Sequence, residues 1–165
     1  MRQKAIYANN YEHGLLPIKE LELDLFPNVS RGKLKTLQIN LGYRCNQACT
    51  HCHVDASPTR KEMMHKDLVN IIPKVLNNNQ IENLDLTGGA PELHPDFRSL
   101  VNNASKLGVN IIDRCNLTIL DEPGYESLAQ FLADKKVTII ASLPCYQQDN
   151  VDKQRGQGVF KKSIK

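Results

Sequence analysis

Residues 42–53 read GYRCNQACTHCH and place three cysteines, Cys45, Cys49 and Cys52, in the spacing C-x3-C-x2-C. A cube of four irons takes one protein ligand per iron, so three thiolates on a short loop hold three irons and leave the fourth free for a small molecule. Structural metal sites are instead closed by a full set of protein ligands. The spacing therefore favours an iron–sulfur site that performs chemistry.

Two other metal sites share parts of this motif. Zinc could take His51 and His53 as additional ligands, although its usual layout pairs two C-x2-C or H-x3-H units. Residues 49–53, CTHCH, also match the attachment signature of c-type haem. That haem is attached outside the cytosol, and residues 1–10 lack the apolar stretch of an export signal. Haem is therefore disfavoured, and zinc remains the alternative.

The cysteine count and the composition indicate a globular protein with reduced thiols in the cytoplasm. Five cysteines are an odd number, and nothing in the sequence indicates an oxidising compartment. The 165 residues, 41% hydrophobic and 24% charged, suffice for one domain with a buried core, and no stretch is apolar enough to span a bilayer. The net charge is only +3 and aromatic residues make up 5%, which argues against nucleic-acid and membrane partners. The only basic cluster comprises Lys161, Lys162 and Lys165.

Hydrophobic periodicity alternates between strand and helix along most of the chain. Residues 34–41 alternate as a half-buried strand does, and residues 63–76 follow the helical period. Such alternation predicts βαβ units and a parallel sheet. The expected strands are residues 34–41, 81–87, 109–114 and 137–142, and the expected helices are residues 63–76, 97–107, 125–133 and a last one that follows residues 154–160.

The unusual residues gather where each expected strand ends. In parallel sheets and barrels the functional loops follow the carboxyl ends of the strands, which meet at one edge. We therefore expect four polar or special segments to converge there. They are the cysteine loop, residues 88–92 (GGAPE), residues 114–116 (RCN) and residues 142–145 (SLPC).

The chain resembles the radical S-adenosylmethionine superfamily in two motifs: the cysteine motif after the first strand and the GGAP turn at residues 88–91 after the second. The resemblance runs from about residue 34 to the last residue. It implies an α/β fold, a partial (β/α) barrel of the radical SAM type with about four parallel strands. Relatives continue through further βα units, so we expect residues 34–165 to be a truncated radical SAM core that follows a leader of residues 1–33.

The resemblance also implies the cofactors and the reaction. Cys45, Cys49 and Cys52 would hold a 4Fe-4S cluster, and S-adenosylmethionine would chelate the open iron through its amino and carboxylate groups. An electron from the reduced cluster would break the sulfonium bond, which gives methionine and a 5′-deoxyadenosyl radical. An external electron donor such as flavodoxin or ferredoxin would be needed.

Within the superfamily, the chain is similar to the arsenosugar-biosynthesis branch, also called radical SAM/Cys-rich domain proteins. That branch transfers the adenosyl group to a methylated arsenic compound, so the resemblance implies a transferase with a methylated arsenical as its small-molecule substrate. The segments that carry the similarity are residues 37–42 (LQINLG), 52–58 (CHVDASP), 86–92 (LTGGAPE), 113–118 (DRCNLT) and 141–146 (ASLPCY).

Relatives place further cofactor contacts at the strand ends. Glycine adds no Cβ, so a Gly-Gly turn would let the main chain approach the methionyl group. Relatives commonly have glutamate where this chain has Ala90, which removes a side-chain partner but keeps the backbone carbonyls; Glu92 is too far along to replace it. Short polar side chains would hold the ribose and the carboxylate. The cofactor-binding residues that the resemblance implies are His51, Gly88, Gly89, Ala90, Asn116 and Ser142.

Three further side chains near the strand ends have open roles. Arg114 would meet the cofactor carboxylate or form an ion pair with Asp113 or Asp85. Cys115 is expected to be a small buried apolar residue. Cys145 would face the substrate or bind arsenic, because a soft thiolate is a natural ligand for a soft element.

Two functions of different classes follow from these observations. The first is a radical SAM enzyme, or the amino-terminal part of one. The second is a module without catalysis that holds an iron–sulfur cluster or zinc. The GGAP turn at residues 88–91 distinguishes the two functions and favours the enzyme. A protein that only carries a cluster does not require such a turn one βα unit after the cysteines.

Overall fold

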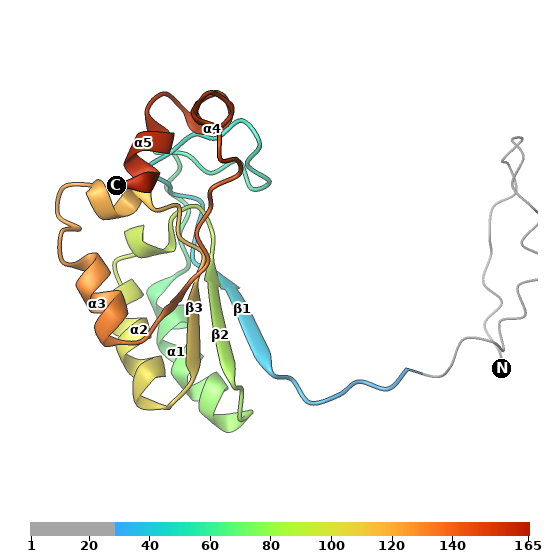
Figure 1. The fold of residues 1–165 in the computed structure, drawn as a ribbon. Coiled ribbons are helices and arrows are strands. Elements are labelled where there is room, and N and C mark those ends of the chain that lie inside the picture. The colour runs from blue at the N-terminus through green and yellow to red at the C-terminus, as the bar shows by residue number, and fades with distance from the viewer. Residues whose placement is uncertain (1–28) are drawn as a thin grey trace, which may run out of the picture. The chain divides into compact units, whose positions relative to one another are not determined.

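The protein is built on a four-stranded parallel sheet (Figure 1). The computed structural model describes residues 29–165, so most of the expected leader, residues 1–33, lies outside the described residues. Neighbouring strands are all parallel and follow the order β1-β2-β3-β4, which confirms the predicted α/β fold. The strands are β1 (Thr36–Asn40), β2 (Asn83–Thr87), β3 (Asn110–Asp113) and β4 (Thr138–Ile139).

The first two predicted helices agree with the structure, and the later part of the chain differs. The third helix begins at Leu128, later than predicted, because a turn with Gly124 at a φ of 88° precedes it. The segment after β4 contains two helices rather than one, since Gly156, with a φ of 115°, ends the first. Among the described residues, no helix combines the length and apolar character needed to cross a bilayer. The helices are α1 (Lys66–Asn78), α2 (Phe97–Lys106), α3 (Leu128–Asp134), α4 (Gln148–Arg155) and α5 (Val159–Ile164), with 3-10 helices η3 (Pro91–Leu93) and η4 (Thr118–Asp121).

Helices α1, α2 and α3 cover one face of the sheet (Figure 1). Side chains alternate across a strand, so Ile39, Leu86 and Ile111 point toward these helices from three successive strands. Cys115 lies in the same core, which confirms the prediction that it is a small buried residue. The helices contribute Val69, Ile72, Leu76, Phe97, Leu100, Val101, Leu128 and Leu132 to this core.

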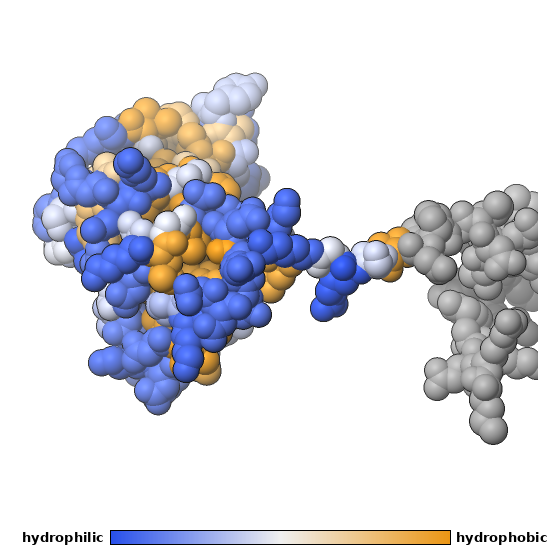
Figure 2. Space-filling view, turned by 90° about the horizontal axis from the view of Figure 1, so that it is seen from below, coloured by the Kyte–Doolittle hydropathy of each residue, from blue (hydrophilic) through white to orange (hydrophobic). Residues whose placement is uncertain are grey.

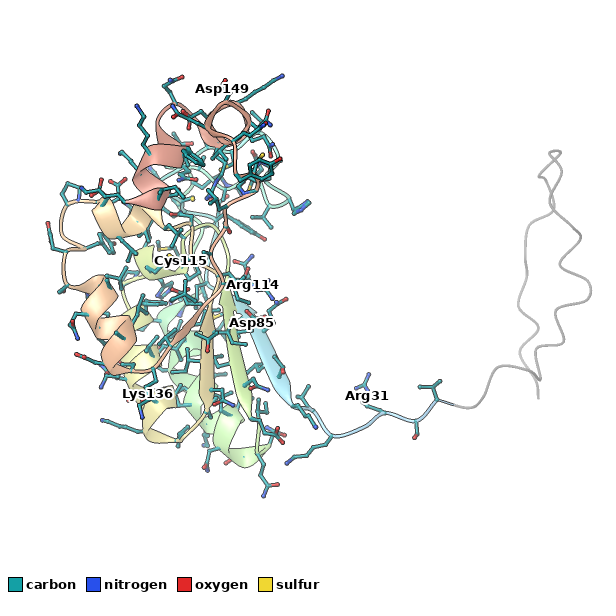
Figure 3. The ribbon with its side chains drawn as sticks, in the orientation of Figure 1. Arg31, Asp85, Arg114, Cys115, Lys136 and Asp149 are labelled. Carbon is teal, nitrogen blue, oxygen red and sulfur yellow. The ribbon has the colours of Figure 1, made fainter. Side chains whose placement is uncertain are left out.

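The opposite face of the sheet carries a polar ladder across three strands. Gln38 on β1 donates from Nε2 to Oδ2 of Asp85 on β2 at 2.8 Å. Arg114, just after β3, donates from Nε and Nη2 to both carboxylate oxygens of Asp85, at 2.9 and 2.8 Å (Figure 3). This bidentate pair holds the pKa of Asp85 below its usual range. Arg114 therefore pairs with Asp85 and not with Asp113.

The sheet ends on an exposed edge at β4. Within residues 29–165, no strand pairs with the outer side of β4. Ile139 and Ile140 are 38% and 41% exposed there. Unpaired edges that carry apolar side chains invite further strand pairing. Viewed from below the sheet, the described surface is hydrophilic with smaller hydrophobic areas between (Figure 2).

Two acidic side chains are buried together on the helix-covered side of the sheet. Asp113 on β3 is 0% exposed and Glu92 on η3 is 4% exposed, and none of their four carboxylate oxygens has a hydrogen-bond partner in the part of the chain that the structure describes. One carboxylate oxygen of each lies within 4.8 Å of the other and of the Cys115 sulfur. Burial raises the pKa of both carboxyl groups, that of Asp113 to about 9, with repulsion from Glu92 as a second cause. The pair therefore retains a proton at neutral pH.

This shared proton makes stability depend on pH. An unfolded chain releases it near the ordinary aspartate pKa of about 3.9, whereas the folded protein keeps it up to a pKa of about 9. The free energy of unfolding should therefore fall as pH rises through this interval, by about 1.4 kcal/mol per pH unit for one proton. The double variant Asp113→Asn/Glu92→Gln should flatten the decline, because neither amide titrates.

Urea unfolding between about pH 6 and about pH 9 measures this dependence. The exposed Asp149→Asn is the matched control and should keep the slope of the unmodified protein. An equally steep decline in the double variant would show that the proton is not held by this pair.

Candidate cofactor site

The four segments that follow the strands do converge around one cavity. The cavity has a volume of about 460 Å³ and opens at the carboxyl end of the sheet. Most of the predicted site residues line it, and two, Ala90 and Cys145, do not. Those that line it are Cys45, Cys49, His51, Cys52, Gly88, Gly89, Asn116 and Ser142, together with His53 and Arg114.

The cysteine loop is held in place by backbone hydrogen bonds to the segment that follows it. Cys45 N–H donates to the Ser57 carbonyl at 3.1 Å, and Ser57 N–H donates to the Tyr43 carbonyl at 3.2 Å. Tyr43 N–H in turn donates to the Glu62 carbonyl at 2.9 Å. The loop thus folds back on residues 57–62 and presents its cysteines to the cavity.

The Gly-Gly turn packs directly against the cysteine loop. Gly89 N–H donates to the Gly42 carbonyl and Ala90 N–H to the Arg44 carbonyl, both at 2.9 Å. A Cβ at Gly88 would lie 2.6 Å from the Gly42 oxygen, and one at Gly89 would overlap the Arg44 oxygen. Both positions therefore require glycine for the contact between the two loops.

The three cysteine sulfurs are spaced too widely for a single zinc ion. Zinc binds thiolates at about 2.3 Å, which places them roughly 4 Å apart. Within residues 29–165, the only group of three Cys, His, Asp or Glu side chains with ligand atoms all within 4.8 Å is the buried one around Asp113. Cys45, Cys49 and Cys52, with or without the histidines, are not such a group. A cube binds each thiolate through a different iron, so it does not require the three sulfurs to surround a single ion.

Two of the sulfurs receive hydrogen bonds from the protein. Cys45 Sγ accepts from Gln47 N–H at 3.4 Å and from Asn116 Nδ2 at 3.5 Å. Cys52 Sγ accepts from Ala56 N–H at 3.3 Å. Burial raises the pKa of the Cys45 thiol, an effect that these donors oppose. N–H donors directed at sulfur suit thiolates that hold a metal cluster.

A buried arginine completes the cavity wall. Arg155 at the end of α4 is 5% exposed, and its Nη1 donates to the Ser142 carbonyl oxygen. Among the described residues, no acidic side chain forms an ion pair with it. A buried positive charge without an acidic partner favours binding of an anionic group. Sequence reasoning missed Arg155 because α4 was not predicted.

The predicted residues that do not line the cavity lie close to it. Ala90 is buried behind the cysteine loop, where it packs with Cys45 and Ala56. Cys145 follows the cavity-lining Pro144, and its Sγ accepts from Gln147 N–H at 3.4 Å and Asn150 Nδ2 at 3.6 Å. These two bonds lower the pKa of the Cys145 thiol. The Cys145 thiol therefore ionises more readily than an ordinary cysteine thiol.

Several curated proteins match parts of the sequence. The chain is 32% identical over 75 residues to a probable GTP 3′,8-cyclase of Saccharolobus islandicus, a match that covers 46% of this chain and 24% of that protein. It is 36% identical over 67 residues to the putative peptide biosynthesis protein YydG of Bacillus subtilis, which covers 40% of this chain and 20% of that protein. The matched region is therefore about a quarter or less of each relative's length.

Solved structures share the fold at lower identity. The TM-score is 0.64 against anSMEcpe with bound AdoMet, at 21% identity over 79% of this chain and 39% of that chain. It is 0.61 against Streptococcus suis SuiB bound to S-adenosylmethionine, at 19% identity over 75% of this chain and 28% of that chain. These likenesses support a partial barrel of the same kind.

A family model described as the Radical SAM superfamily matches residues 39–164, which is most of the chain. The matched range includes the cysteine loop, the Gly-Gly turn and every strand end around the cavity. Proteins of this family use a 4Fe-4S cluster and S-adenosylmethionine. The chain belongs to the radical SAM superfamily.

Proposed function

We propose that this chain provides the cofactor site of a radical SAM enzyme, with Cys45, Cys49 and Cys52 as the cluster ligands. The observation that carries the proposal is that the three thiols line one cavity that is large enough for a small molecule. When bound, the cluster supplies the electron that cleaves the sulfonium bond of S-adenosylmethionine reductively. The protein's part is to hold that bond close to the cluster and to keep water away.

The cavity offers partners for each part of S-adenosylmethionine. The main chain at Gly88 and Gly89 would receive the methionyl ammonium through its carbonyl oxygens, and the Ser142 hydroxyl would bind a ribose hydroxyl or the carboxylate. Arg155, which has no acidic partner within residues 29–165, would bind the carboxylate, which neutralises its charge. His51 would lie along the adenine. Arg114 is already paired with Asp85 and is less free for this role.

The first test is product formation under anaerobic reducing conditions. After reconstitution with iron and sulfide, the protein should release methionine and 5′-deoxyadenosine from S-adenosylmethionine on addition of dithionite, measured by liquid chromatography. Cys49→Ser should abolish both products, because the cluster loses one of three ligands. The matched control Cys115→Ser lies in the core away from the cavity and should retain them if it folds. If the reconstituted protein binds S-adenosylmethionine but releases neither product, the result would favour a module that holds an iron–sulfur cluster without catalysis.

The second test concerns Arg155. Replacing a charged hydrogen-bond donor costs about 1.5–3 kcal/mol, so Arg155→Gln should weaken S-adenosylmethionine binding by roughly tenfold or more. Equilibrium dialysis against the reconstituted protein measures this affinity. Lys153→Gln removes an exposed charge from the same helix and should leave it unchanged. Equal affinities for S-adenosylmethionine in both variants would show that Arg155 does not bind the cofactor.

The substrate we propose is a methylated arsenical, which would receive the adenosyl group. Two observations support this: the five segments that resemble the arsenosugar branch, and Cys145, whose thiol pKa is lowered next to the cavity. A thiolate is a soft ligand that suits trivalent arsenic. Flavodoxin or ferredoxin would supply the electron, in the cytoplasm.

Cys145→Ser tests the arsenical proposal without needing turnover. Both proteins compared carry serine in place of the three loop cysteines, so that these do not compete for arsenic. The protein that retains Cys145 should bind a trivalent methylated arsenical, and the one that also carries Cys145→Ser should not, because oxygen is a poor ligand for a soft element. Isothermal titration before reconstitution measures this binding. Binding that persists in Cys145→Ser would show that Cys145 is not the arsenic ligand, contrary to the proposal.

A further inference from the structure

Asn116 lines the cavity, and its side chain also contacts the cluster-ligand loop. Asn116 follows β3, is 5% exposed, and approaches the sulfur of Cys45. Its Nδ2 donates to Cys45 Sγ at 3.5 Å and to Asn46 Oδ1 at 2.7 Å. Both amide hydrogens are thus used within the protein.

The orientation of this amide follows from its other neighbours. Asn116 Oδ1 accepts from the backbone N–H of Ile119 and from the Thr118 hydroxyl, both at 3.1 Å. A backbone N–H can only donate, so the oxygen must face Ile119 and the NH2 group must face Cys45. The side chain has no donor left for a ribose hydroxyl.

A second layer of hydrogen bonds fixes the same arrangement from the cysteine loop. Asn46 Nδ2 donates to the Thr118 hydroxyl at 3.0 Å and to Glu122 Oε1 at 3.1 Å, and Gln47 Nε2 donates to the same hydroxyl at 2.6 Å. The Thr118 oxygen therefore uses its single hydrogen and both lone pairs. We call these side chains the amide clamp: Asn46, Gln47, Asn116, Thr118 and Glu122.

We propose that Asn116 is a positioning residue whose N–H hydrogen bond to the Cys45 thiolate raises the reduction potential of the cluster bound there. This inference rests on the proposed function. Reduction adds negative charge that spreads onto the cluster's sulfurs, and an N–H donor stabilises the reduced form more than the oxidised form. Burial strengthens the effect, because the dielectric around Asn116 and Cys45 is low. The amide clamp keeps the donor from turning away.

Asn116→Leu tests the proposal, because it removes the donor at similar size without adding charge. The midpoint potential of the reconstituted cluster, measured by electron paramagnetic resonance during a redox titration without S-adenosylmethionine, should shift to lower values. Asn103→Leu, an exposed position on α2, is the matched control and should keep the potential of the unmodified protein. If Asn116 instead binds the cofactor, the potential without cofactor stays unchanged and only the affinity for S-adenosylmethionine falls, which would overturn the proposal.

A second variant covers the case in which Asn116→Leu does not fold or load. Asn116→Ala removes the same N–H donor without placing a branched side chain beside Ile119, so the potential should shift in the same direction. An unchanged potential in Asn116→Ala would then overturn the proposal. Failure of the unmodified protein to form any cluster would contradict the proposed function itself, which separates the two results.

Discussion

The close contact between the cysteine loop and the Gly-Gly turn is the constraint on which the site depends. Two backbone hydrogen bonds, from Gly89 to Gly42 and from Ala90 to Arg44, join the loop after β1 to the turn after β2. A side chain at Gly88 or Gly89 would occupy space that the loop backbone fills. The glycines were expected to let a cofactor approach; they also let two protein loops approach each other, which sets where the sulfurs lie.

The acidic side chains on the two faces of the sheet are neutralised in different ways. On the face away from α1–α3, Asp85 is neutralised by Arg114 and stays ionised. On the helix-covered face, Asp113 and Glu92 pair with no cation among the described residues and retain a proton instead. Both solutions avoid an isolated buried charge, which would cost several kcal/mol. The cavity wall contains the exception, since Arg155 is buried with no acidic partner among residues 29–165.

The sequence predicted the elements whose pattern is local, and it missed those that depend on distant contacts. The β1 and β2 strands and helices α1 and α2 follow from periodicity, and the convergence at the strand ends follows from the rules of parallel sheets. Helix α4 was missed because only Val151 and Arg155 are buried on it, too few for an apolar pattern. The hydrogen bonds from Asn116 to Cys45 and Asn46 join residues about 70 positions apart, so no local signal could reveal them.

The proposed site requires three cysteines to hold a cluster with one iron open to S-adenosylmethionine. Electron paramagnetic resonance of the anaerobically reconstituted, reduced protein tests this requirement. We predict a 4Fe-4S signal that changes on addition of S-adenosylmethionine, because the cofactor binds the open iron. A signal that ignores the cofactor, or a protein that forms no cluster and retains zinc instead, would contradict the account.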